Sequence, residues 1–570
     1  MQIIKTYLVF VFLLQINNIT AQSTYLGNAN NEYQLLDRLD IKNMDSGRLT
    51  LFSTKPYLRK TMVKYVEFLD SALRTKYSEN KYDISSVDRY NMEKLLKNNP
   101  EWLQTTPTSY NSKKTFLNRF FVTKNNFYEV NQKDIKIVLN PMIQQTQGIE
   151  ANNKKRIFLN SKGLEVRGLI GKKIGFYAML TDNQENGPTF YRSRVDSLQA
   201  VPGNAYYKRF KPVGVNDRGQ DYFDYRGYIT FKAGKLVDVQ YGFDKNFIGN
   251  GQRSLFLSDI SAPMLFLKLN TNVWKLNYQN LFMELTPTFT GLTGGSLNGK
   301  KYAAMHHLGI EVGNNASIGL FESIIFQRKN NFELSYLVPV IFYRAVESGL
   351  GSADNAIIGA DFKVNFAQSF QFYGQVLVDE FKLSYFKEKN WGEKIGGQAG
   401  LKYIDVAGIK NLDFQFEWNI VRPYTYSHYD STTTYTHYNQ PLAHPLGANF
   451  NDLLVILKYQ PSNKLNFIFK AFAMGQGLDS TKKQTRTFGG NIFRTYNVRV
   501  GDKNQLLLQG VRGKTVNASL AASYELLPNL YADASLYYRS FNTSILPKRQ
   551  TTTMLNIGLR WNMVRRELDY

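Results

Sequence analysis

The sequence has no cysteine among its 570 residues and only 5 histidines. The absence of cysteine excludes disulfides, thiolate metal sites, a cysteine nucleophile and a lipid-modified N-terminal cysteine. After the N-terminus, no stretch reaches the roughly 18 consecutive apolar residues of a membrane-spanning helix. The short motifs of serine hydrolases, P-loop nucleotidases and zinc proteases are also missing. The sequence therefore indicates no enzyme, no cofactor and no metal site.

Basic residues outnumber acidic ones, with 70 Lys+Arg against 46 Asp+Glu and a formal net charge of +24. The cations are scattered along the chain instead of forming one run, which argues against nucleic acid as a partner. For an exported protein, lipid phosphates, acidic polysaccharide or an anionic solute in a lumen fit better, and simple solvation explains the charge equally well. A chain of this length usually forms two or more soluble domains, although one closed barrel can use as many residues.

The N-terminus has the pattern of a secretory signal peptide. Lys5 precedes a short apolar core at residues 7–14, and Ile19-Thr20-Ala21 fits a small-residue cleavage site. The apolar core is too short for a membrane anchor. We therefore expect residues 1–21 to be removed on export, which leaves residues 22–570 as the mature protein.

Residues 22–110 carry helical signals. Along one segment, apolar residues recur every three or four positions and so fall on one helix face. Ser85 and Asp88 have the spacing of a capping box at the start of another helix. We predict a small helical periplasmic domain at residues 22–110. Its expected helices cover residues 33–40, 58–73 and 85–99.

From about residue 135, the period of the apolar residues changes from that of a helix to that of a strand. In residues 412–420, leucine, phenylalanine, tryptophan and isoleucine alternate with aspartate, glutamine, glutamate and asparagine. The alternation recurs at residues 237–244, 530–539 and 555–562. Strands with one apolar and one wet face fit either soluble sandwiches or a transmembrane barrel whose apolar faces meet lipid.

The lengths of the connections separate these two folds. Eight short turns alternate with nine longer connections, and an outer-membrane barrel has this alternation of periplasmic turns and external loops. We therefore predict an all-β transmembrane barrel of the outer-membrane type at residues 111–570, with about 18 antiparallel strands. An even strand number places the helical domain and the C-terminus on the periplasmic side. The expected long connections lie near residues 149–155, 185–224, 246–262, 287–300, 328–354, 382–393, 425–449, 476–503 and 543–550.

The densest motif lies in the connection after the fifth strand, at residues 242–259. Gly249 and Gly251 allow positive φ and a tight bend. The charges of Lys245, Arg253 and Asp259 are placed to pair within the folded loop. The spacing fails as a dinucleotide fingerprint, because a third glycine and a following helix are missing. We predict a structured loop that folds over or into the barrel, with direct ligand contact as the alternative.

A second connection, residues 425–449, is rich in tyrosine and holds three of the five histidines. No spacing there matches a known metal-ligand pattern. Rigid aromatic faces with polar edges suit adaptable binding surfaces, and stacking on sugar rings is chemically reasonable. We predict Tyr426, Tyr429, His437 and Tyr438 as polysaccharide contacts, and we predict no metal site.

Three parts of the sequence resemble one known family. They are residues 244–259 with Pro263, residues 33–41 followed by 55–59, and residues 557–562 near the end. They make the mature chain similar to the Wzi-like capsule-assembly family of Bacteroidota, and within it to members associated with gliding motility. The resemblance implies an 18-stranded outer-membrane barrel with a helical periplasmic domain. It also implies a lectin-like role in holding capsular polysaccharide, without assigning binding residues.

We therefore expect a non-enzymatic outer-membrane barrel that binds or organises surface or capsular polysaccharide and supports gliding or surface adhesion. Its expected partners are outer-membrane lipid, surface polysaccharide and other gliding or secretion proteins of the envelope, with no nucleic acid. Two alternatives stay open: a diffusion channel, and a structural partner of a secretion or gliding machine that docks through the periplasmic helices. Hydrolysis of lipid or sugar is the weakest alternative.

Overall fold

A computed structural model describes most of the chain. The signal peptide predicted at residues 1–21 lies outside the described residues. These are residues 23–27, 31–43, 51–73, 83–103, 107–113, 115–117, 119–151, 153–171, 173–211, 219–287, 298–329, 331–340, 342–379, 388–479 and 485–570.

Eighteen long antiparallel strands close into one barrel within this part of the chain, which confirms the predicted fold class. The ring closes where β24 pairs with β3, with Trp561 opposite Ile143. Short strands β2 (Tyr128–Asn131) and β6 (Lys208–Phe210) add to β3 and β7. The long strands are β3 (Ile135–Glu150), β4 (Asn153–Ile170), β5 (Ile174–Asn186), β7 (Gly219–Ala233), β8 (Val237–Asp244), β10 (Met264–Val273), β11 (Leu276–Leu285), β12 (Lys301–Val312), β13 (Ala316–Phe326), β14 (Asn355–Phe366), β15 (Phe370–Asp379), β16 (Lys394–Tyr403), β17 (Leu412–Val421), β20 (Phe450–Tyr459), β21 (Leu465–Leu478), β22 (Val511–Leu527), β23 (Leu530–Thr543) and β24 (Gln550–Trp561).

The barrel wall is polar inside and apolar outside, the reverse of a soluble sandwich. On β17, Glu417 and Asn419 are buried toward the lumen, whereas Phe416 and Trp418 on the other face are exposed. Since side chains alternate along a strand, each strand can present one face to lipid and one to the lumen. This arrangement explains the alternation in the sequence.

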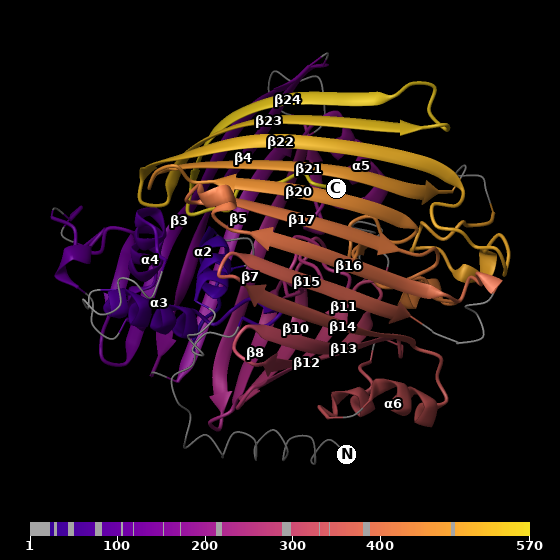
Figure 1. Cartoon of the computed structure of the whole chain (residues 1–570), viewed down its shortest axis with the longest axis horizontal. Coiled ribbons are helices and arrows are strands. Elements are labelled where there is room, and N and C mark those ends of the chain that lie inside the picture. Colours follow the sequence, from indigo (N-terminus) through magenta and orange to yellow (C-terminus); the bar gives the residue numbers. More distant parts are fainter. Residues whose placement is uncertain are drawn as a thin grey trace.

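Short turns gather at one end of the barrel and long connections at the other (Figure 1). In outer-membrane barrels the short-turn end is periplasmic and the long-loop end is external. One predicted long connection, near residues 149–155, is wrong. Only residues 151 and 152 separate β3 from β4, because both strands extend beyond the expected boundary.

Within the described residues, three α-helices precede the barrel: α2 (Asn31–Lys42), α3 (Arg59–Leu73) and α4 (Ser86–Asn98). The capping box is confirmed, because the Ser85 hydroxyl accepts the Asp88 N–H while the Asp88 carboxylate accepts the Ser85 N–H. The apolar stripe of α3 is buried in a cluster shared with α2 and α4. None of the described helices is long and apolar enough to cross a membrane.

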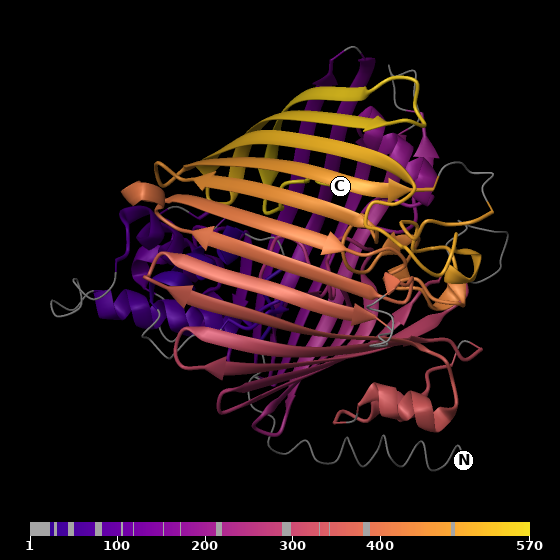
Figure 2. The same cartoon turned by 45° about the vertical axis from the view of Figure 1, so that its right-hand side comes forward.

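These helices dock against the mouth of the barrel at its short-turn end (Figure 2). Arg38 of α2 forms ion pairs with Asp405 and Asp413, which flank the turn between β16 and β17. On the same helix, Asp40 pairs with the lumenal Lys363 at 2.8 Å. The helices therefore close the mouth against the wall. A domain boundary at residue 110 stays a prediction, and the first long strand begins at Ile135.

Two connections and the chain end fill the rest of the lumen. The β8–β10 connection (residues 245–263) and the β17–β20 connection (residues 422–449) share one buried apolar cluster with inward-facing strand residues. The tail at residues 563–570 turns back into the barrel, where Lys470 contacts Glu567 and the Tyr537 hydroxyl donates to the Leu568 carbonyl. The described lumen is thus packed with protein from both ends.

Candidate functional site

The motif loop at residues 245–259 lies inside the barrel and is held by the wall. The Glu417 carboxylate accepts the backbone N–H groups of Gln252 at 2.7 Å and Arg253 at 3.1 Å. On β15, Gln375 accepts the Leu255 N–H and donates to the Ile248 carbonyl. Buried hydrogen bonds to a charged acceptor are among the stronger ones in proteins. These hydrogen bonds hold the loop in a defined position inside the barrel.

The N-terminal segment also holds this loop. Strand β1 (Thr54–Lys55) pairs with β9 (Phe247–Ile248), and the Gly249 N–H donates to the Ser53 carbonyl at 2.8 Å. Residues nearly 200 positions apart in the sequence therefore form one small sheet inside the barrel. This sheet links the helices that close the mouth to the loop at the centre of the lumen.

Lys245, Arg253 and Asp259 make other contacts than the predicted charge pairs within the loop. Lys245 Nζ donates to the Asp259 backbone carbonyl at 2.9 Å, and burial lowers the pKa of Lys245 to about 8. Arg253 turns away from the loop. Its guanidinium lies 3.7 Å from Asp452 on β20, contacts Asp569 of the tail, and stacks over Phe472. Arg253 therefore joins the loop to the wall and to the tail.

The predicted positive φ at the two glycines is wrong, although the chain does bend at residues 250–253. Gly249 and Gly251 do not have positive φ. Close approach explains Gly251 instead, because a Cβ there would lie 2.1 Å from a Glu417 carboxylate oxygen. At Gly249 the nearest atom to a Cβ is at 3.1 Å. Only the absence of a side chain at residue 251 lets the loop backbone reach the carboxylate.

Two of the four predicted sugar contacts are buried. Tyr426 is 1% exposed, and its hydroxyl donates to the Leu255 carbonyl at 2.7 Å. His437 is 2% exposed; its Nδ1 accepts the Thr286 N–H and its Nε2 donates to the Pro263 carbonyl. Burial lowers the pKa of His437 to about 3. Both side chains fasten the β17–β20 connection to the β8–β10 connection, so in this structure neither is open to a polymer outside.

The other two lie nearer the surface. Tyr429 is 45% exposed, and its carbonyl accepts the Thr495 hydroxyl and the Asn497 amide. Tyr438 is half-buried on a small hairpin formed by β18 (Thr436–His437) and β19 (Gln440–Pro441), which contacts the end of α5 (Thr189–Leu198) through Asn439. The four residues therefore do not form one exposed surface, and sugar contact at Tyr429 and Tyr438 stays a prediction.

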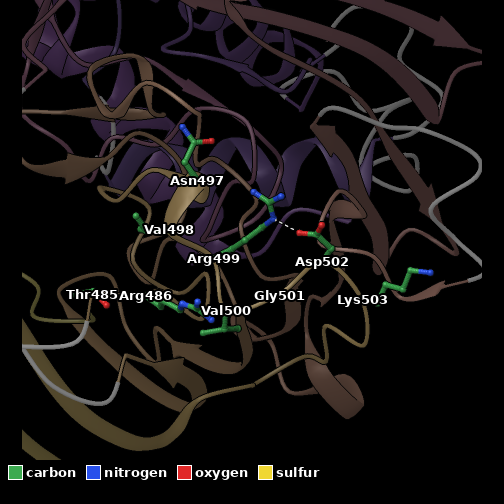
Figure 3. Close-up of a pocket in the computed structure, with 9 residues that line it drawn as sticks. All are labelled: Thr485, Arg486, Asn497, Val498, Arg499, Val500, Gly501, Asp502 and Lys503. Atoms are coloured by element: carbon green, nitrogen blue, oxygen red, sulfur yellow. Dashed lines mark hydrogen bonds and ion pairs between the residues drawn. The ribbon is translucent and has the colours of Figure 1, made fainter.

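Beside Tyr429 an open cleft of about 730 Å³ lies in the β21–β22 connection at the external end of the barrel (Figure 3). Within its lining, Arg499 donates to Asp502 at 2.6 Å. Arg486 and Lys503 are exposed at its edges. The cleft is lined by Thr485, Arg486, Asn497, Val498, Arg499, Val500, Gly501, Asp502 and Lys503.

An aromatic and cationic cluster stands next to this cleft. The rings of Trp391 and Tyr496 lie 4.6 Å apart. The Arg499 guanidinium lies 4.4 Å from the Trp391 ring centre, and Lys394 Nζ lies 4.4 Å from that of Tyr496. Such cation–π contacts hold the flat side chains in place. Sequence reasoning missed this cluster, because Trp391 and Tyr496 belong to different connections more than a hundred residues apart.

A serine, histidine and aspartate meet in the lumen but lack the geometry of a catalytic relay. Ser53 Oγ and Asp361 Oδ2 both lie close to Nε2 of His307, at 3.0 and 2.6 Å. A relay needs its two partners at opposite nitrogens of the ring. The described residues also include no group of three His, Asp or Glu side chains suited to a metal ion.

No family model matches the sequence, and no curated protein matches it. Among solved structures, the chain is similar to Wzi of Escherichia coli, described as an outer-membrane protein involved in group 1 capsule assembly and a carbohydrate-binding β-barrel. The identity is 12%, the TM-score 0.54, and the match covers 96% of this chain and 100% of that one. OprD of Pseudomonas aeruginosa (11% identity, TM-score 0.40, 75% and 94% covered) and OccAB2 of Acinetobacter baumannii (10%, 0.40, 75% and 98%) match less well. The likeness to Wzi shows the shared fold, and the chain is an outer-membrane β-barrel.

Proposed function

We propose that the protein binds surface or capsular polysaccharide at its external cleft and holds it at the cell surface without enzymatic turnover. The observation that carries the proposal is the cluster of Trp391, Tyr496 and Arg499 beside an open cleft with basic edges. The fold likeness to a barrel described as carbohydrate-binding supports it. A cleft on external loops is the part of such a barrel that a long polymer outside the cell can reach.

The chemistry of the cleft suits a weak, repeated contact. An aromatic face packs against the C–H face of a sugar ring, and guanidinium or ammonium groups bind carboxylates or phosphates on the polymer. Arg499 is paired with Asp502, and Lys503 is paired with Glu388 at 2.8 Å. An acidic sugar would therefore meet Arg486 directly and would compete with Glu388 for Lys503. Many such contacts along one polymer give high avidity even when each contact is weak.

The packed lumen favours holding over transport. The helices, the motif loop, the β17–β20 connection and the tail all pack against lumenal residues of the wall. A polymer bound at the cleft stays outside the membrane. We extend this proposal to a role in gliding or surface adhesion and to contacts with other envelope proteins. This extension rests on the resemblance of the sequence to the gliding-motility protein RemB.

Two measurements test the proposal. In cells, a deletion strain is compared with its parent for the partition of polysaccharide between cells and medium. Movement into the medium at constant total amount supports retention. Unchanged partition with lost colony spreading contradicts retention and supports a role in motility instead.

The second measurement is binding of purified polysaccharide to the barrel in detergent. Trp391→Ala and the pair Arg486→Glu with Lys503→Glu should each weaken binding by at least about tenfold, which is about 1.4 kcal/mol. The matched control is Lys548→Glu with Arg549→Glu, which reverses two exposed charges in another external connection. Equal loss in the control would mean that net charge, and not the cleft, governs binding.

A further inference from the structure

The connection between β13 and β14 forms an arm on the outside of the barrel (Figure 1). The arm, defined as residues 331–340 and 342–354, contains the 3-10 helix η4 (Leu334–Leu337) and α6 (Tyr343–Leu350). Tyr336 and Tyr343 are fully buried between the arm and the wall. They pack in one apolar cluster with the strand residues Phe282, Tyr302, Ala304, Ile324, Phe326 and Ala356.

The covered face of the wall is the one that points away from the lumen. On β12, His307 points inward, where it contacts Ser53 and Asp361, so its neighbour His306 points outward. On β13, Phe321 stacks at 4.5 Å on Phe256 of the motif loop, so Glu322 points outward. Alternation along each strand fixes this assignment.

The arm reaches far down the wall. The Tyr278 hydroxyl, near the short-turn end of β11, donates to the Pro339 carbonyl of the arm. At the middle of β12, the His306 ring lies 3.9 Å from the ring of Tyr343. Glu322 accepts the Arg344 N–H at 3.1 Å. The arm therefore covers outward-facing wall residues at a depth where neighbouring strands face lipid.

Under the arm, the outward face is unusually polar for a barrel wall. His306, Glu322 and Asn280 occupy positions where alternation would place lipid-facing side chains. Nearby uncovered positions on β13 and β14 hold the exposed apolar residues Ile318, Leu320 and Ile358. Polar groups facing hydrocarbon are costly unless they are hydrogen-bonded or covered. The arm supplies that cover.

The face of the arm that points away from the wall is apolar. Val340 is 83% exposed and Phe342 is 79% exposed, both at the turn between η4 and α6. Leu334, Val338 and Leu350 continue this apolar face. Leaving such side chains in water forgoes the free energy gained by burying apolar surface. The face is continuous with the lipid-facing band of the barrel.

We propose that the arm is a lipid-embedded element: its apolar face lies among the acyl chains of the membrane, and its inner face replaces lipid over the polar part of the wall. The charged groups agree with this placement. Arg344 extends to Glu347, one turn closer to the external rim, and pairs with it at 2.7 Å. Pairing with an opposite charge lowers the cost of placing a cationic side chain at this depth. This inference is independent of polysaccharide binding.

Collision measurements on single nitroxide labels test whether lipid contacts the apolar face of the arm. Because the chain has no cysteine, Val340→Cys and Phe342→Cys each give one labelling site in the full-length barrel. In proteoliposomes, both labels should collide often with oxygen and rarely with a water-soluble nickel chelate, as at the lipid-band control Leu320→Cys. Nickel accessibility equal to that of the external control Lys548→Cys would overturn the proposal, because the arm would then be in water. Protection from both reagents would also overturn it and would point to a second copy of the chain on this face.

A second experiment tests the covering role. Replacing residues 331–353 with a short Gly-Ser linker should lower the unfolding temperature of the barrel in lipid. Adding His306→Leu and Glu322→Leu to that deletion should restore much of the loss, since an apolar wall no longer needs cover. The same two substitutions in the intact protein should destabilise it, because Glu322 would no longer accept the Arg344 N–H. If the leucines fail to restore the deleted form, the arm does not act by covering polar wall residues.

Discussion

Glu417 on the barrel wall accepts the backbone N–H of Gln252 at 2.7 Å. A strand side chain, and not a backbone carbonyl, is therefore the acceptor for this N–H inside the lumen. The second carboxylate oxygen accepts the Arg253 N–H. A carboxylate can serve both donors because it has two acceptor oxygens and no hydrogen. This pair fixes where the motif loop crosses the lumen.

Glu417→Gln should therefore destabilise the loop although the two side chains have nearly the same shape. The amide has only one acceptor oxygen, and its NH2 group would face a backbone N–H. A buried donor left without an acceptor costs about 1–3 kcal/mol. Hydrogen exchange of residues 246–259 should rise accordingly. Glu311→Gln, on the half-buried end of β12, is the control and should leave that exchange unchanged.

Gly251→Ala should disturb the same contact from the other side. The added Cβ would lie 2.1 Å from the Glu417 carboxylate oxygen, so the loop or the strand must shift. Overpacking of this kind costs about 1–3 kcal/mol. Gly249→Ala is the matched control, because its nearest contact is 3.1 Å. The unfolding temperature in detergent should fall more for residue 251, and equal effects would contradict the close-approach explanation.

The strands and the helix cap could be predicted because each depends on neighbours within a few positions. The alternation along β17 and the pairing of Ser85 with Asp88 are local patterns. The exposure of Tyr426 and His437 could not be predicted in this way. It depends on Leu255 and Pro263, which are about 170 residues away in another connection. A long tyrosine-rich connection has the same sequence pattern whether it folds into the lumen or over it.

The docking of the β17–β20 connection should depend on pH. Burial lowers the pKa of His437 to about 3 and that of His444 to about 4, against an ordinary value of 6.5. Both rings are therefore neutral when docked, and the undocked chain binds the extra protons. The stabilisation is fully present above about pH 6.5 and falls below it by up to about 1.4 kcal/mol per pH unit for each histidine, levelling off near pH 3–4.

Limited proteolysis of residues 425–449 between pH 7.5 and pH 4 checks this expectation. Cleavage should increase as the pH falls. His437→Gln should weaken docking at every pH and flatten the profile, because a glutamine that cannot titrate replaces one of the two histidines. A profile with the same slope in this variant would show that another group controls the opening.

Arg38 should be the residue whose loss most loosens the closed mouth. Its side chain is buried and pairs with Asp88, Asp405 and Asp413, which tie α2 to α4 and to the turn after β16. Removing one partner from a buried ion pair costs about 3–5 kcal/mol, since the remaining charges stay buried. Arg38→Gln should raise hydrogen exchange in residues 31–43 and produce openings in planar-bilayer recordings, where the unmodified protein should stay near baseline. Lys410→Gln is the matched control, because its pair with Asp83 is exposed and contributes about 0–1 kcal/mol. Steady conductance of the unmodified protein would instead support the diffusion-channel alternative, because ions would then have a path past the helices without any change to Arg38.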